Sequence, residues 1–420
     1  QANHGGHTSQ VVLCHLAASI ADGQAECAVL AGGELGSAIR TGRFEADIGT
    51  PTGPFVADDG PRSSPDEAIG DDLHQWVCHP YEAAFGVGDP IHMYPVMDTA
   101  LGAALGRSRE EHVRALGELW ARMSAVATTN PYATDRRGHT ADEITTANAR
   151  NRFVGHPYTK LMNSDQFVDQ GAAIVLCSAS YAAAAGIPRD RWVFPWAGVT
   201  AHEAVPSERA HLHESRALTI AATRLEALLD RRLCETELVD LYACFPFAVQ
   251  TQARALALGD RTELTLTGGM RFAGGPWNNY GTHMVANAVA HVREQPDAMA
   301  VCSTGAGSAS PVVSSSTRLK VQRRLSRSRS SVSSASIRSP RRVQHRQPDC
   351  SSIMLSLTYS TSRWSRPTSP NSLIITAVPA SAGSFSSLLS SVVLPEPRKP
   401  VRMVAGIRFC DMGRGVRRGE

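Results

Sequence analysis

Four side chains in the second half of the chain are of types that carry out acid–base or nucleophilic chemistry: Tyr242, Cys244, Tyr280 and His283. A phenol or an imidazole can act as a general acid or base, and a cysteine can act as a nucleophile. Tyr242 and Cys244 stand at the end of a predicted strand, where functional sites of α/β proteins form. Packing in the core explains Cys244 equally well.

A glycine-rich stretch lies just before Tyr280. Four glycines and a proline fall within residues 268–276. Glycines spaced so densely between a strand and a helix let the backbone approach a ligand or another backbone closely. Asn278 then places an amide at the start of the following helix. Gly274, Gly275 and Asn278 are therefore our candidates for binding a substrate.

The elements that must position these residues alternate between helix and strand. Apolar periodicity predicts helices at residues 10–21, 109–126, 182–185, 215–229, 247–258 and 284–292. Short apolar runs predict strands at residues 26–31, 168–177, 192–194, 238–245, 263–266 and 298–302. This alternation favours an α/β core.

The charge of the chain is divided unevenly along its 420 residues. Residues 308–420 contain 19 Lys and Arg against 4 Asp and Glu, whereas residues 1–307 contain 23 against 35. The same 113-residue tail contains 27 serines. It could be an Arg/Ser-rich segment that binds phosphate backbones, or the product of a shifted reading frame. We favour the second explanation, expect no nucleic-acid partner, and expect the tail to be largely disordered.

The nine cysteines are widely spaced, and no two form a CxxC pair. They indicate reduced thiols in a cytoplasmic protein. No apolar run reaches membrane-spanning length and no signal peptide is visible, although the chain begins with Gln1 and we expect it to be a fragment. Two groups of residues have metal-like spacing but supply no complete four-ligand set, so we expect no metal site. They are His74, Cys78 and His79, and His211 and His213.

Seven segments, in the correct order, resemble the thiolase superfamily, specifically thiolase-like proteins close to the sterol-carrier-protein-x thiolases and bacterial acetyl-CoA acetyltransferases. No single motif carries the resemblance, which extends over roughly residues 4–304. The segments are Gly5–Gln10, Ala28–Glu34, Pro157–Met162, Val168–Ala173, Glu208–Ala210, Asp240–Pro246 and Thr267–Met284.

The resemblance implies two similar halves that stack into αβαβα layers, with a loop domain inserted in the first half. The expected divisions are a remnant of the N-terminal half at 1–35, the loop domain at 36–157, the end of the first half at 158–190, the C-terminal half at 191–306, and the low-complexity tail at 307–420. The first strands would precede Gln1, and the last strand of the second half would fall in the tail. An intact family member is expected to be a homodimer.

The resemblance also implies chemistry on an acyl-CoA, with the thioester as substrate and no other cofactor. Family enzymes make or break a carbon–carbon bond with a cysteine at a helix N-terminus, a Gly-His-Pro histidine and a second cysteine in a Cys-x-Gly loop. In this chain the nucleophile position falls at Gly5, the histidine position at Gly275 and an oxyanion-water position at Tyr242. Cys302 to Gly305 match the last loop only loosely. An acyltransferase active in lipid metabolism is implied, but without its usual Cys and His.

Two further readings of the resemblance stay open. A thiolase-like subgroup without the cysteines resembles retro-aldolases that cleave steroid side-chain coenzyme A thioesters, assisted by a small partner protein, with tyrosines as acid and base. Tyr242 and Tyr280 fit that scheme by residue type. A non-catalytic acyl-CoA-binding subunit is the third reading. Lys160, the sole lysine before residue 308, could contact coenzyme A phosphates or be an ordinary surface residue.

Overall fold

The computed structural model describes residues 5–42, 79–201 and 203–305, together with four strands at 312–318, 359–363, 373–381 and 402–406. The four strands come from the Ser/Arg-rich tail, and the other residues of the tail lie outside the described part. Within the described part, no helix is long and apolar enough to cross a membrane.

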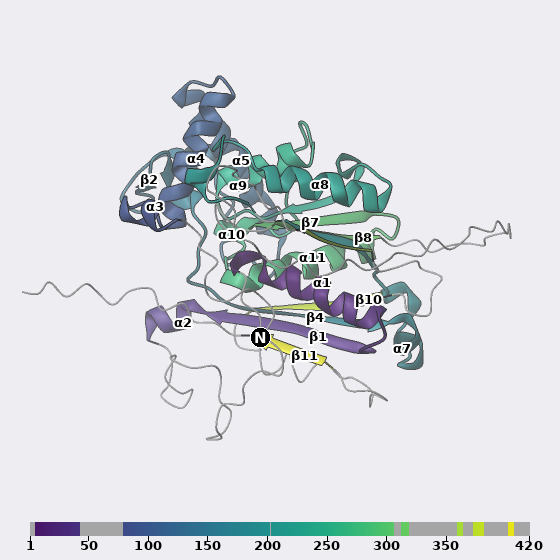
Figure 1. Ribbon diagram of the computed structural model, residues 1–420. Helices are drawn as coiled ribbons and strands as arrows, with labels where there is room; N and C mark the ends of the chain where they lie inside the picture. The colour runs from purple at the N-terminus through teal and green to yellow at the C-terminus, as the bar shows by residue number, and fades with distance from the viewer. Residues whose placement is uncertain are drawn as a thin grey trace, which may run out of the picture.

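Two large sheets lie one above the other in Figure 1, apart from a small sheet of two strands. The upper large sheet has the strand order β6-β7-β8-β5-β9. β6 and β7 are parallel, whereas β8 runs antiparallel to both β7 and β5. Its strands are β5 (Pro195–Ala201), β6 (Leu238–Leu241), β7 (Met299–Gly305), β8 (Val312–Arg318) and β9 (Tyr359–Arg363). Helices α8 (Arg216–Leu229) and α9 (Pro246–Ala255) lie on its outer side (Figure 1). α8 faces this sheet with an apolar stripe that includes Leu218 and Leu225.

The lower sheet is built around one long antiparallel pair, β1 (Cys27–Leu35) and β4 (Asp169–Ser178). β10 (Leu373–Ser381) pairs with the free side of β4, and β11 (Arg402–Gly406) pairs in parallel with the free side of β1. Both β1 and β4 are buried on both faces, as expected for strands that read as continuous apolar runs.

Two helices separate the sheets: α1 (Thr8–Ala21) and α11 (Tyr280–Glu294) lie between them in Figure 1. The first ten residues of α11 are all buried, because sheet, helix or loop covers the helix on every side. On the far face of the lower sheet, the short helix α7 (Ala179–Ala184) and the rings of Trp192 and Phe194 cover part of the apolar surface. This layered α/β arrangement confirms the fold class expected from the sequence.

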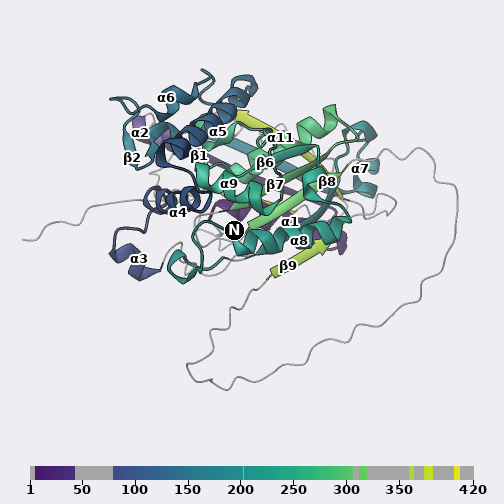
Figure 2. The ribbon, with the colours of Figure 1, turned by 90° about the horizontal axis from the view of Figure 1, so that it is seen from above.

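The segment inserted between β1 and β4 is mostly helical and gathers at one side of the sheets (Figure 2). Its described elements are α2 (Gly36–Thr41), α3 (Pro80–Ala84), α4 (Pro90–Ala104), α5 (Arg109–Thr129), α6 (Ala141–Thr145), β2 (Phe153–Gly155) and β3 (Tyr158–Thr159). α5 begins with a capping box in which Ser108 and Glu111 satisfy each other's backbone amides. Apolar residues of α5, such as Trp120 and Met123, join the main core.

Short helical turns complete the described chain. They are η1 (Gly5–His7), η2 (Lys160–Met162), η3 (Arg189–Arg191), η4 (Pro206–Glu208), η5 (Leu233–Glu235), α10 (Gly269–Phe272) and η6 (Trp277–Asn279). Among them, η4 connects β5 to α8, while α10 and η6 lie in the long connection between α9 and α11.

Four sequence predictions of individual elements were wrong. The strand expected at 238–245 ends at Leu241, so Tyr242 and Cys244 lie in the connection between β6 and α9. Residues 192–194 were expected to be a strand, but the strand begins at Pro195 because the rings at 192 and 194 pack on the lower sheet instead. Residues 263–266 form no strand, since the hydroxyl of Thr265 bonds to a buried carboxylate and to loop amides. Helix α4 was not predicted, because it contains Pro95, which normally disfavours a helix interior.

Candidate active site

The start of α1 meets the loop before α11 and the end of β7. The hydroxyl of Ser9 donates to the backbone carbonyl of Asn278. The side chain of Gln10 donates to the carbonyl of Cys302 at 3.5 Å and accepts from the hydroxyl of Thr304 at 2.9 Å. These bonds bring three segments, far apart in the sequence, to one point between the two sheets.

The glycine-rich stretch is held by backbone bonds to the inserted segment and to the loop before β4. The amide of Gly275 donates to the carbonyl of Asp165 at 2.8 Å, and the amide of Asp165 donates to Met270 at 3.1 Å. From the other side, the Asn130 side chain donates to the carbonyl of Thr267 at 2.8 Å. The glycines therefore allow the backbone of this stretch to approach the backbone of the loop before β4 closely.

Two of these glycines could not carry a side chain without a collision. Gly274 has φ +110°, and a Cβ atom there would lie 2.4 Å from Oε1 of Gln170. Gln170 cannot easily move away, because its Nε2 donates to the carbonyls of Tyr132 and Ala273. Gly268 has φ +102°, and its Cβ would lie 2.6–2.7 Å from backbone and Cβ atoms of Ala127 in α5.

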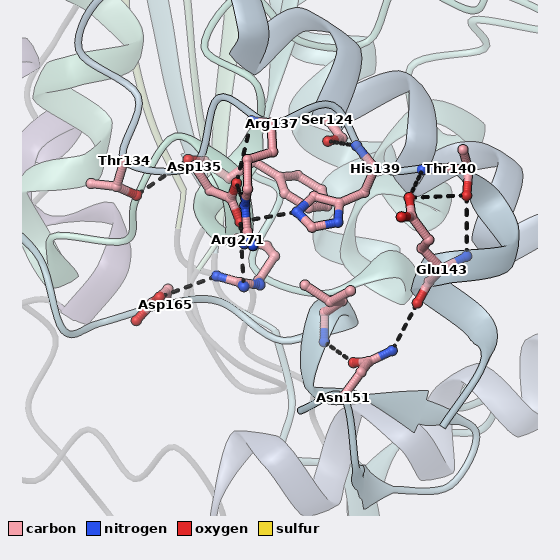
Figure 3. Close-up of polar contacts among 12 residues, drawn as sticks. Ser124, Thr134, Asp135, Arg137, His139, Thr140, Glu143, Asn151, Asp165 and Arg271 are labelled. Atoms are coloured by element: carbon pink, nitrogen blue, oxygen red, sulfur yellow. Dashed lines mark hydrogen bonds and ion pairs between the residues drawn. The ribbon is translucent and has the colours of Figure 1, made fainter. Parts of the chain in front are cut away.

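Charged residues fix helix α10 within the glycine-rich stretch (Figure 3). Arg271 is largely buried and its guanidinium contacts the carboxylates of Asp165, at 3.1 Å, and Asp135, at 3.6 Å. Asp135 also accepts from Arg137 and His139 at 2.7 and 3.1 Å. Hydrogen bonding by Arg137 is the largest of the effects that hold the pKa of Asp135 well below its usual range, against the opposing effect of burial.

A small cavity lies between this stretch and α11, with room for one water-sized group, about 10 Å³. Polar side chains supply most of its wall. The lining residues are Asn130, Tyr132, Gln170, Thr267, Ala273, Gly274, Tyr280, His283 and Asn287. Oε1 of Gln170 and Nε2 of His283 have no hydrogen-bond partner there. A water molecule or a substrate hydroxyl in the cavity could donate to Oε1 of Gln170 and bond to Nε2 of His283.

Three of the candidates from the sequence, Gly274, Tyr280 and His283, line this cavity. Burial lowers the pKa of His283 to about 4, so its imidazole is neutral near pH 7. Burial also raises the pKa of Tyr280 well above its ordinary value. The ring of Tyr242 packs edge-on against Tyr280, with centroids 5.7 Å apart, and its pKa is raised for the same reason. The cavity wall thus offers neutral hydrogen-bonding groups.

No cysteine side chain is among the residues that line the cavity. Cys244 is buried and hydrogen-bonded to Tyr94, and burial raises its pKa to about 12. Burial raises the pKa of Cys302 well above its usual range. Cys14, within α1, has its pKa raised to about 12. Since the thiolate is the nucleophilic form, none of these three cysteines is activated.

The remaining candidates are not among the residues that line the cavity. Gly5 lies in η1, which packs against η6, where Asn278 is found. Gly275 lies beside Gly274, with its amide bonded to Asp165. Lys160 is exposed on η2, where its backbone amide donates to Arg152 at 2.9 Å and its carbonyl accepts from Asn163 at 3.2 Å. No group of three residues able to hold a metal ion occurs within the described part of the chain; His74 and Cys78 lie outside it.

Sequence reasoning missed three buried polar residues next to the cavity: Gln170, Asp240 and Thr267. Gln170 and Asp240 occur within apolar strand runs and are only 5% and 0% exposed. A polar side chain in a run that must be buried is itself a signal, because such groups are kept only when they have a partner or a task. Asp240 in particular, two residues before the candidate Tyr242, could have been singled out.

Three solved structures have a fold similar to that of this chain. A monomeric SCP2-thiolase-like protein of type 1 from Mycobacterium smegmatis matches with a TM-score of 0.63 and 27% identity, over 76% of this chain and 62% of that one. An Ltp2-ChsH2(DUF35) aldolase matches with a TM-score of 0.55 and 16% identity, over 76% and 79%. The dimeric peroxisomal thiolase of Saccharomyces cerevisiae matches with a TM-score of 0.51 and 14% identity, over 76% and 75%.

No protein-family model and no curated protein sequence matches the chain. The chain spans 62% of the length of the Mycobacterium smegmatis protein. The structural likenesses show that the chain has a thiolase-like fold.

Proposed function

We propose that this chain binds a coenzyme A thioester and cleaves a carbon–carbon bond beside it by retro-aldol chemistry, with tyrosine in place of cysteine. One observation carries the proposal. The cavity at the meeting point of the glycine-rich stretch and α11 is lined by the phenol of Tyr280 and the imidazole of His283, and no cysteine is among its lining residues.

Retro-aldol cleavage requires a base for the substrate hydroxyl and donors for the oxygen of the enolate that forms. It requires no thiolate, which agrees with the raised pKa of Cys244 and Cys302. Neutral donors held in fixed positions stabilise a developing oxyanion, because they need not reorganise during the reaction. The cavity admits a single oxygen-sized group, so the acyl chain would lie outside it.

The structural neighbours support the same class of chemistry by fold alone. Two of them are named as a thiolase-like protein and a thiolase, and a third is named as an aldolase with a DUF35 component. By this analogy we propose an acyl-CoA as ligand and a small partner protein as one form of assembly. A monomer, a dimer and a complex all occur among these neighbours, so they favour no single oligomeric state.

The reaction products distinguish this proposal from acyl transfer. The purified chain would be given a 3-hydroxyacyl-CoA, and separately a 3-ketoacyl-CoA with free coenzyme A. We expect the first mixture to yield a shortened acyl-CoA and a ketone or aldehyde, without consumption of free thiol. Products from the second mixture only, with loss of free thiol, would instead identify an acyltransferase. Tight binding without any product would identify a non-catalytic subunit and contradict the proposal.

A further inference from the structure

A carboxyl group is buried directly behind the cavity wall. Asp240 lies on β6 and is fully buried. Its Oδ1 accepts hydrogen bonds from the hydroxyls of Thr265, at 2.9 Å, and Thr267, at 3.3 Å. Neither hydroxyl carries charge, so a carboxylate here would be held by hydrogen bonds alone. A buried acid of this kind commonly serves a function, since burial without a cation is costly.

Thr267 connects this carboxyl to the cavity. Its hydroxyl lies 2.7 Å from the hydroxyl of Tyr280, and it donates to Asp240. Because a hydroxyl has one proton to give, Tyr280 must donate to Thr267 in this arrangement. Tyr280 and Thr267 both line the cavity, whereas Asp240 does not. The result is an unbroken chain of two hydrogen bonds from the cavity to the buried carboxyl.

We propose that Asp240 and Thr267 are positioning residues that form, with Tyr280, a proton relay between the cavity and the interior. The inference rests on the proposed retro-aldol function. As Tyr280 takes the proton of the substrate hydroxyl, it gives its own proton to Thr267, which passes its proton to Asp240. The carbon–carbon bond breaks, leaving a carbonyl product and a thioester enolate. The enolate carbon is then protonated as the three transfers reverse, so no net proton is gained or lost.

The surroundings of Asp240 suit it to this task. The groups that face it are Thr265 and Thr267 from the loop, Tyr280 from α11 and Cys302 from β7, and none is cationic. Burial is the largest effect on the carboxyl and raises its pKa to about 7, although its hydrogen bonds oppose that shift. A group with a pKa near the working pH can both accept and return a proton.

Fluorine NMR tests the relay without any substrate. The full chain would carry 3-fluorotyrosine at position 280, and its ¹⁹F shift would be followed from about pH 5 to about pH 8, through the expected titration of the buried acid. We expect a step centred near the pKa of Asp240. Asp240→Asn should abolish the step, and Thr267→Val should reduce it severalfold. The matched variant Thr265→Ser keeps the hydroxyl that bonds to Asp240 and to the amides of Thr267 and Gly268, and it should retain the step.

A shift that does not change with pH in the parent chain, or a step that persists in Asp240→Asn, would overturn the relay. With a working substrate, Asp240→Asn should lower kcat roughly 100-fold at unchanged KM and remove the pH dependence near neutrality. If the parent chain turns over no thioester, the proposed function fails, while the NMR result still decides whether the relay exists.

Discussion

At the scale of single residues, Asp135 shows how a charged group that is largely buried can stabilise the fold around α10. Its carboxylate receives hydrogen bonds from Arg137 and His139 and faces the buried guanidinium of Arg271. These contacts keep the folded-state pKa below the unfolded value. The carboxylate therefore adds stability above its unfolded pKa of about 3.9, and this contribution is lost as the pH falls toward the folded pKa.

We predict that Asp135→Asn lowers the free energy of unfolding by about 2 kcal/mol at pH 7, through loss of charge-assisted hydrogen bonds. The difference from the parent chain should shrink as the pH falls below about 4, since the parent then loses the same interaction. Urea unfolding of the parent chain and the variant, at pH 7 and at about pH 3, measures this difference in the free energy of unfolding. Asp260→Asn, in an exposed turn, is the control and should change little. A penalty that is equal at both pH values would contradict the explanation.

The sequence could identify part of the candidate site. Tyr280, His283 and Gly274 were recognisable because chemically versatile side chains follow a dense run of glycines. Gln170 and Asp240 were missed, although a polar residue within an apolar strand run is a recognisable signal of a buried polar group. Gln170 reaches the cavity through a contact with Ala273, 103 residues along the chain. Asp240 reaches it through contacts with Thr265 and Thr267, 25 and 27 residues along the chain. A single sequence carries no direct signal for such contacts.

At the scale of elements, the glycine-rich stretch determines how α5 and the loop before α11 fit together. Gly268 lies with φ +102° directly against the backbone of α5. The backbone of a helix cannot move aside as the end of a flexible side chain can. A methyl group at Gly268 would therefore collide with Ala127, in addition to the strain of its positive φ.

We predict that Gly268→Ala lowers the free energy of unfolding by more than about 3 kcal/mol, combining backbone strain with overpacking. Gly106→Ala is the matched control, because Gly106 also has positive φ, +65°, but nothing within 4 Å of the added Cβ. It should cost only about 1–2 kcal/mol. Chemical unfolding of both variants gives the comparison. Equal penalties would mean that the contact with α5 does not matter.

Helices were easier to predict than strands. The expected helices at 10–21, 109–126 and 215–229 agree closely with α1, α5 and α8, because each shows clear apolar periodicity or a capping signal. The strand expected at 263–266 was wrong, since alternation of residue types does not reveal where hydroxyls find partners. The β-propensity of a segment sets only a local preference, whereas tertiary contacts decide whether the segment forms a strand.

At the scale of the whole molecule, strands from the tail complete both sheets. β8 lies between β7 and β5, so it joins the two parts of the upper sheet. β10 and β11 cover the outer sides of β4 and β1. The layered α/β class was predictable from the alternation of elements and the resemblance. The resemblance placed one further strand in the tail, but the pairing of β10 and β11 with the lower sheet was not predictable, because composition alone suggested little regular structure there.

We predict that a chain ending at Gly305 fails to fold cooperatively, because the upper sheet loses a central strand. A chain ending at Arg363 keeps β8 and β9 but leaves β1 and β4 with unpaired edges, and we expect it to fold and associate. Gel filtration and thermal unfolding followed by circular dichroism distinguish these cases. A monodisperse, cooperatively melting chain ending at Gly305 would show that the tail strands are dispensable.

The central claim is that the chain breaks a carbon–carbon bond beside a coenzyme A thioester with a tyrosine and without a cysteine nucleophile. It is tested most directly by the rate of product formation from a 3-hydroxyacyl-CoA in two single variants, Tyr280→Phe and Cys244→Ser. We predict that Tyr280→Phe lowers kcat roughly 100-fold or more, while Cys244→Ser leaves it nearly unchanged. Loss of turnover in Cys244→Ser, with full turnover in Tyr280→Phe, would contradict the account.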